Sequence, residues 1–121
     1  LVVLDTSPYP SVTEATSQAL VLRRRDSGAE FDVHMTDELQ KVCRKLGVKT
    51  SFKDDYVTRI NQTREKPMSY GRTELGRLIA ATQGEVTGTT LQIPTTGYHT
   101  TRETASMESI TSAIRVLRTY V

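Results

Sequence analysis

Short apolar runs of β type alternate along this chain with stretches whose apolar residues recur at helical spacing. The β-type runs occupy residues 1–4, 19–25, 48–52 and 86–93, and the helical stretches occupy residues 35–46, 73–84 and 106–121. The predicted order is therefore strand, strand, helix, strand, helix, strand, helix. Alternation of this kind predicts an α/β fold in which a sheet is sandwiched between helices.

Capping residues support the predicted helices. Thr36 or Asp37 could begin the first helix, and Thr73 and Ser106 stand at the starts of the other two. The last helix carries a single apolar stripe formed by Met107, Ile110, Ile114, Leu117 and Val121. A stripe of this width is typical of a helix that packs on a core.

Three segments are less regular. Pro8 and Pro10 oppose continuation of the first strand, so a loop is predicted to begin at Asp5. Residues 11–17 hold a capping-box pattern but few apolar positions, which indicates a loop or one helical turn. Residues 53–68 are polar without a clear period, so we expect a loop with a possible helical turn around Tyr56 and Ile60.

Composition excludes several classes of protein. A net charge of +2 is too mild to indicate binding to nucleic acid or to an anionic membrane, and no apolar run approaches the roughly 20 residues that span a bilayer. The single Cys43 cannot form an intrachain disulfide, which favours a reducing compartment such as the cytoplasm. Because the chain opens inside an apolar strand without methionine, we interpret residues 1–121 as a fragment of a larger domain.

Asp5 and His99 are the candidate metal ligands. Each follows an apolar β-type run, and open α/β sheets place their ligand sites at strand ends. Carboxylate and neutral imidazole are donors that zinc accepts, although a catalytic zinc usually needs three protein ligands. Asp5 could instead make an Asx-turn or cap a helix. Glu103 could orient the imidazole of His99 or could be a solvated loop carboxylate.

Other polar residues receive simpler interpretations. Arg23, Arg24 and Arg25 alternate between the faces of a strand and are expected to be a solvated strand end. His34 is expected at the surface near a helix N-terminus, and Cys43 is expected to act as a small buried hydrophobe. The turn Gly71-Arg72-Thr73 opens a helix with exposed backbone donors, so it could hold a carboxylate or a peptide end.

Four motifs in this order resemble the glutamyl and deblocking aminopeptidases, a family of co-catalytic two-metal peptidases. They are Val2-Val3-Leu4-Asp5, residues 22–31, the turn Gly71-Arg72-Thr73-Glu74, and Ile93-Pro94-Thr95-x-x-Tyr98-His99-x-x-x-Glu103. The resemblance covers nearly the whole chain but only the C-terminal part of such an enzyme. It implies a three-layer α/β/α sandwich whose N-terminal part is missing here.

The resemblance also implies a function. Asp5 would be a terminal ligand of one metal and His99 a ligand of the other, with Glu103 behind it and Gly71, Arg72 and Thr73 near the substrate. The remaining ligands and the general-base glutamate would precede Leu1. In the complete enzyme, two zinc or cobalt ions would activate a bridging water that attacks the N-terminal bond of a peptide. The complete protein is expected to be a homo-oligomer.

Two other functions compete with this one. A non-catalytic α/β interaction module could retain the fold and use its loops for binding. A nucleic-acid binder that uses Arg23–Arg25 is disfavoured, because the net charge is nearly neutral and no aromatic residues interleave the basic ones.

Overall fold

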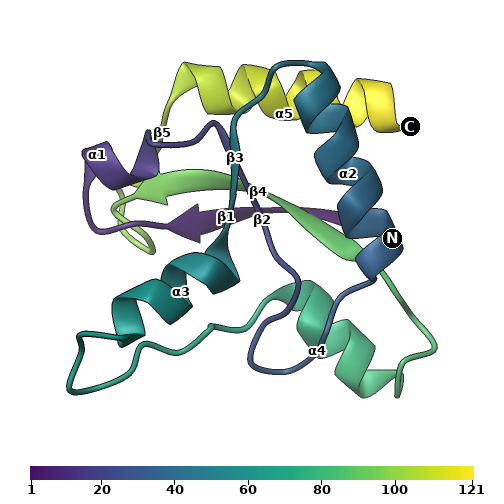
Figure 1. Ribbon diagram of the computed structural model, residues 1–121, viewed down its shortest axis with the longest axis horizontal. Coiled ribbons are helices and arrows are strands. Elements are labelled where there is room, and N and C mark those ends of the chain that lie inside the picture. The colour runs from purple at the N-terminus through teal and green to yellow at the C-terminus, as the bar shows by residue number, and fades with distance from the viewer.

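A mixed five-stranded sheet forms the centre of the molecule, seen here as a computed structural model of residues 1–121 (Figure 1). Its strands are β1 (Val2–Pro8), β2 (Leu20–Leu22), β3 (Thr50–Phe52), β4 (Thr89–Thr96) and β5 (Thr104–Ala105). The strand order is β1-β4-β2-β3, and β5 pairs with β4. β1 runs parallel to β4 and β2 parallel to β3, whereas β2 and β5 run antiparallel to β4.

Helices cover both faces of this sheet. They are α1 (Val12–Ala15), α2 (Val33–Lys45), α3 (Lys53–Asn61), α4 (Glu74–Ala81) and α5 (Met107–Tyr120). α2 and α5 lie together on one side of the sheet, and α3 and α4 lie on the other (Figure 1). This arrangement confirms the α/β fold with flanking helices. None of the helices is both long and apolar enough to cross a lipid bilayer.

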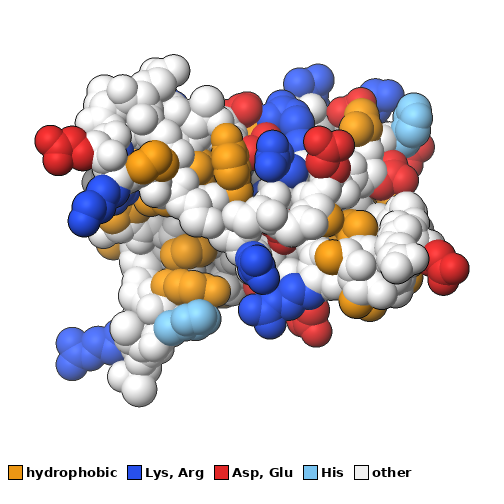
Figure 2. Space-filling view, turned by 90° about the horizontal axis from the view of Figure 1, so that it is seen from below, with side chains coloured by type: hydrophobic (Ala, Val, Ile, Leu, Met, Phe, Trp, Pro, Cys, Tyr) orange, Lys and Arg blue, Asp and Glu red, His pale blue; other side chains and the backbone are white.

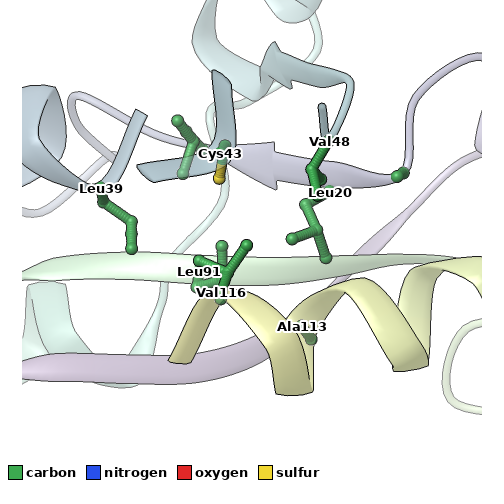
Figure 3. Close-up of a cluster of buried hydrophobic side chains, with 9 residues drawn as sticks. Leu20, Leu39, Cys43, Val48, Leu91, Ala113 and Val116 are labelled. Atoms are coloured by element: carbon green, nitrogen blue, oxygen red, sulfur yellow. The ribbon is translucent and has the colours of Figure 1, made fainter. Parts of the chain in front are cut away.

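Strand alternation divides the core into two clusters. Leu20 and Leu22 of β2 face α2 and α5, where they join a cluster that includes Leu39, Cys43, Leu91, Ala113 and Val116 (Figure 3). Val21, between them, points to the opposite face and packs with Tyr9, Ala15, Tyr56 and Val57. Cys43 is fully buried in the first cluster, as its place on the predicted apolar stripe indicated.

Two strands include prolines that were expected to lie outside them. β1 reaches Pro8, so Asp5 lies in the middle of the strand and not in a loop. β1 is an edge strand paired only with β4, and an edge strand tolerates a residue without an N–H. β4 runs through Pro94, which lies between the residues that pair with β2 and those that pair with β5. At that point its second edge has no partner strand.

Residues 53–61 form the helix α3, where a loop was predicted. The helical period was hidden because the buried face includes two charged residues, Lys53 and Asp54, beside Tyr56 and Val57. The expected cap of α2 was also wrong. Asp32 caps this helix through a hydrogen bond from the Met35 backbone N–H to its carboxylate (2.9 Å), and Thr36 is buried inside the first turn.

The apolar stripe of α5 largely faces outward, which contradicts the prediction. Met107 and Ile114 are 74% and 54% exposed, whereas the buried positions are Ser109, Ser112, Ala113 and Val116. Small side chains let the helix lie close to the sheet and to α2. A hydrophobicity pattern does not register buried serines, so the inward face could not be identified from the sequence.

Candidate functional site

One open groove on the α3 and α4 side of the sheet collects most of the residues singled out by the sequence. Its volume is about 680 Å³. Three segments form its walls: Asp5 of β1, residues 72–81 at α4, and Tyr98 and His99 in the loop between β4 and β5. Figure 2 shows this side of the molecule, where basic side chains gather near the middle and a histidine lies beside hydrophobic side chains. Residues 94 positions apart in the sequence therefore meet at one surface.

Asp5 lies half-buried in the floor of the groove. One oxygen of its carboxylate accepts a hydrogen bond from the Thr6 backbone N–H (2.8 Å). Asp5 is paired in register with Gln92 of β4, so the two side chains lie on the same face of the sheet. The Gln92 side-chain oxygen in turn accepts a hydrogen bond from Arg23 Nε (2.8 Å). The carboxylate thus lies in a polar row that runs from β1 across β4 to Arg23, just past the end of β2.

His99 lies in the loop of residues 97–103 that joins the antiparallel strands β4 and β5. Its backbone has a positive φ of 58°, and its ring stacks on Tyr98 with the centroids 3.7 Å apart. The hairpin requires glycine at position 97, where φ is 70° and a Cβ would lie 2.7 Å from the Arg102 carbonyl oxygen. The imidazole is exposed at the groove, and stacking on the Tyr98 ring limits its motion.

Glu103 does not orient His99 in this structure. Its carboxylate accepts a hydrogen bond from Thr95 Oγ1 (3.0 Å), and no hydrogen bond joins it to the imidazole. Thr95 pairs with Ala105, so this contact lies at the base of the hairpin. The carboxylate thus contacts the base of the hairpin, and a role for Glu103 behind the histidine stays a prediction.

Asp26 fixes the turn that forms the second wall of the groove. One oxygen of its carboxylate accepts hydrogen bonds from the backbone N–H and the hydroxyl of Thr73 (2.7 and 2.8 Å). The other oxygen accepts from the N–H groups of Gly28 and Ala29 (2.7 and 2.9 Å). Burial alone would raise the pKa of Asp26, but these hydrogen bonds hold it below the ordinary value. The carboxylate thereby ties the exit of β2 to the start of α4.

The same turn is held from two further points. Arg23 donates to the Tyr70 carbonyl oxygen (2.5 Å), and the Ser27 N–H donates to the Gly71 carbonyl oxygen (2.8 Å). Thr73 then caps α4, as predicted, by accepting a hydrogen bond from the Gly76 N–H (3.0 Å). The predicted turn, residues 71–73, is thus rigid, but its backbone donors are not exposed as expected. Thr73 is buried and its N–H is bound to Asp26, and the Gly71 N–H donates to Ser69 Oγ (2.9 Å). The exposed residue of the turn is Arg72.

Sequence reasoning missed Asp26, and it placed Arg23 wrongly. Arg23 is only 5% exposed and is not part of a solvated strand end. Burial lowers the pKa of its guanidinium, while the charges of Asp26, Asp54 and Asp5 act in the opposite direction. Arg24 does reach solvent, and it forms ion pairs with Asp54 and Asp55 (both 3.0 Å). Arg23 and Asp26 lie within the motif of residues 22–31, but that motif did not specify their partners, so only the structure identifies their roles.

Lys53 is a second buried cation near this site. Its ammonium lies 3.7 Å from the ring centre of Tyr9 and donates to the Pro8 carbonyl oxygen. Burial, followed by the charge of Arg23, lowers its pKa from 10.5 to about 8. Folding therefore holds this lysine in an environment that disfavours its charged form.

We expect Lys53 to give the stability a distinctive pH dependence. Between pH 8 and 10.5 the unfolded chain binds a proton that the folded chain lacks, so the free energy of unfolding due to Lys53 rises with pH. The rise should be about 2 kcal/mol after solvent screening. The measurement is the difference in unfolding free energy between the natural chain and Lys53→Met across this range. Burial raises the pKa of Cys43 to about 11, which makes an opposite contribution to the pH dependence of stability. Both chains contain Cys43, so its contribution cancels in the difference. A difference that does not change with pH would contradict the expectation.

The groove does not contain a complete metal site. The chain has no group of three or more histidine, cysteine, aspartate or glutamate side chains that could hold an ion. Asp5 and His99 line the same groove as two donors, and His34 lies exposed on α2, away from them. The residues present thus fit part of a ligand set and would need donors from outside this chain.

Comparison with known proteins identifies a similar fold. No protein-family model matches the chain, and no curated protein matches it significantly. The solved structure of PhTET1-12s, a dodecamer in the asymmetric unit, is similar with a TM-score of 0.66 and 14% sequence identity. The match covers 96% of this chain but only 31% of the PhTET1-12s chain. The likeness shows that residues 1–121 share the fold of about a third of the PhTET1-12s chain.

Proposed function

We propose that this chain is the C-terminal part of the catalytic domain of a metal-dependent aminopeptidase, and that Asp5 and His99 each bind one of two divalent ions. The observation that carries the proposal is the shared groove: Asp5, the turn at Thr73 and His99 line it together, although they are far apart in the sequence. These residues belong to three of the four motifs that resemble the glutamyl and deblocking aminopeptidases. The likeness to PhTET1-12s, a TET aminopeptidase, supports the same assignment.

The residues of this chain would have distinct tasks in such an enzyme. The bound metals would supply the activated water, and the remaining ligands and the general base would come from outside this chain. Asp5 and His99 would each supply one protein donor to an ion bound in the groove. Arg72 and Arg77 line the wall at α4, where they would attract a carboxylate or a peptide carbonyl oxygen of the substrate. Asp26 would keep that wall in place.

The chemistry of the two donors fits zinc or cobalt, and the substrates would be peptides with a free N-terminus. Oligomerisation of the complete protein is supported by the dodecamer of PhTET1-12s. We also propose a cytoplasmic location, on the basis of the single cysteine, which lies fully buried at Cys43.

Metal dependence tests this function. We expect the protein that carries this chain together with the missing ligands to hydrolyse aminoacyl-nitroanilides, to lose activity with a chelator, and to regain it with zinc or cobalt. Residues 1–121 alone should hydrolyse nothing and bind zinc weakly, because two donors leave an ion mostly aquated. Tight stoichiometric zinc binding by the chain alone, measured by calorimetry, would contradict the assignment of two separated ligands.

A non-catalytic interaction module is the second candidate. It is favoured by the lack of a three-donor group in a groove that nevertheless presents Arg72 and Arg77. Such a module would bind peptides in the groove without hydrolysis, and a chelator would leave the binding unchanged. The chelator experiment thus separates the two functions.

A further inference from the structure

A second pocket lies away from the groove, between α1, β3 and α3. Its volume is about 530 Å³, and it shares no lining residue with the groove that holds Asp5 and His99. Four consecutive residues, 49–52, form the side at the edge strand β3. The proposed peptidase chemistry makes no use of this pocket.

Two buried tyrosines form the floor of the pocket. The rings of Tyr9 and Tyr56 meet edge to face, with centroids 4.9 Å apart and an angle of 63°. The Lys53 ammonium lies 3.7 Å from one ring centre and 4.8 Å from the other, which fixes both rings. The Tyr9 hydroxyl is buried and makes no hydrogen bond within the chain. The floor is therefore rigid and retains one unused polar group.

A hydrogen-bonded wall stands beside this floor. The Gln18 side-chain oxygen accepts hydrogen bonds from Ser17 Oγ (2.9 Å) and Ser51 Oγ (3.0 Å). Its amide nitrogen donates to the carbonyl oxygens of Glu14 and Ala15 (2.9 and 2.8 Å). These contacts join α1 to β3, so the shape of the pocket does not depend on a ligand.

Opposite charges line the pocket without pairing with each other. Glu14 accepts a hydrogen bond from the Tyr56 hydroxyl (3.3 Å), whereas the Arg59 guanidinium lies over the face of the same ring, 5.5 Å from its centre. Tyr56 therefore separates the anion from the cation. Lys49 adds a second cation, and none of these three groups forms an ion pair. The other carboxylate of the pocket, Asp55, is already paired with Arg24 (3.0 Å).

We propose that this pocket binds a small zwitterion that carries both an ammonium and a carboxylate, as a free amino acid or a dipeptide does. Glu14 receives the ammonium, Arg59 and Lys49 receive the carboxylate, and the ring of Tyr56 lies under the atoms between them. Glu14 is half-buried and the two cations are exposed at the rim, so separated charges of opposite sign stand around a rigid floor. This arrangement complements a ligand with the same separation of charges. A ligand with only one of the two charges leaves one side of the pocket unpaired.

Titration of residues 1–121 with four probes, followed by amide NMR shifts, tests the proposal. L-Alanine or dialanine should give saturable shifts around Ser17, Ser51 and Arg59, and the tighter of the two identifies the source of the zwitterion. Acetate and methylammonium, which carry one charge each, should bind at least about tenfold more weakly. Equal binding of acetate, or no saturable shifts with either zwitterion, would overturn the proposal.

Charge-neutral variants supply the matched controls. Glu14→Gln and Arg59→Gln should each weaken binding of the zwitterion by at least about tenfold, because each removes one charge-assisted contact. Glu65→Gln and Arg64→Gln remove the same charges from exposed positions outside the pocket and should leave binding unchanged. Amide spectra of the free variants report their folding. Folded Glu14→Gln and Arg59→Gln variants that bind like the natural chain would overturn the proposal.

Discussion

Gly76→Ala should destabilise the fold by about 3 kcal/mol, as severe overpacking does. A Cβ at this position would lie 2.0 Å from the Asp26 carboxylate oxygen that accepts both hydrogen bonds from Thr73. The carboxylate is 1% exposed and makes four hydrogen bonds, so it has no room to move without losing them. Helix propensity predicts the opposite sign, because alanine is better than glycine inside a helix by about 1 kcal/mol. Denaturant unfolding of the two chains measures which effect is larger.

Gly28→Ala is the matched control for this prediction. Gly28 also contacts Asp26, but its Cβ would lie at 3.4 Å, an ordinary van der Waals distance. We expect a change within about 1 kcal/mol, because no close contact arises. A Gly76→Ala chain as stable as the natural one, or more stable, would show that the contact between α4 and Asp26 is looser than the structure has it.

His99→Ala should reduce aminopeptidase turnover of the complete protein by at least about 100-fold. Loss of a residue that only orients a metal ligand costs up to about 100-fold, and loss of the ligand itself should cost more. Loss of the imidazole would remove a protein donor to one metal and weaken its binding, so the enzyme would lose the water activation that this ion supplies. The ring is exposed, so its removal leaves no cavity in a core. The measurements are turnover of an aminoacyl-nitroanilide, metal content, and circular dichroism.

Two further variants separate chemistry from structure at His99. Its positive φ of 58° strains an alanine, so His99→Asn, which tolerates that backbone better, should lose activity similarly while keeping the hairpin. His34→Ala removes the other exposed histidine, on α2, and should retain full turnover. A folded His99→Asn protein with unchanged turnover would remove His99 from the reaction.

Much of the fold could be predicted because apolar periodicity registers large hydrophobic side chains. Leu39 and Cys43 of α2 and Leu20 and Leu22 of β2 carry that signal and are buried as expected. The signal failed where polar or small residues are buried. Lys53 hid the helix α3, and Ser109 and Ser112 hid the inward face of α5. In both helices the buried face is set by contacts with the rest of the fold and not by the hydrophobicity of the residues on it.

The candidate site could be predicted only in part, for a similar reason. Asp5, Thr73 and His99 stand in short motifs, and parallel pairing of β1 with β4 places two of these segments side by side. Asp26 and Gly76 form a close contact between residues 50 positions apart, and no motif specifies that contact. Glu103 was singled out because it follows His99 by four residues, but in the structure its carboxylate contacts Thr95. Local sequence patterns can single out a polar side chain, but they do not specify which distant residue it contacts.

The most direct test of the proposed function is the number of metal ions bound by the complete protein and by its Asp5→Asn/His99→Ala variant. We expect two zinc or cobalt ions per natural chain. The folded double variant should lose at least one ion and its turnover, because each ion loses a protein donor. Elemental analysis after dialysis, with turnover measured on the same samples, gives both values. A folded double variant that retains two ions per chain and full turnover would contradict the assignment of Asp5 and His99 as metal ligands.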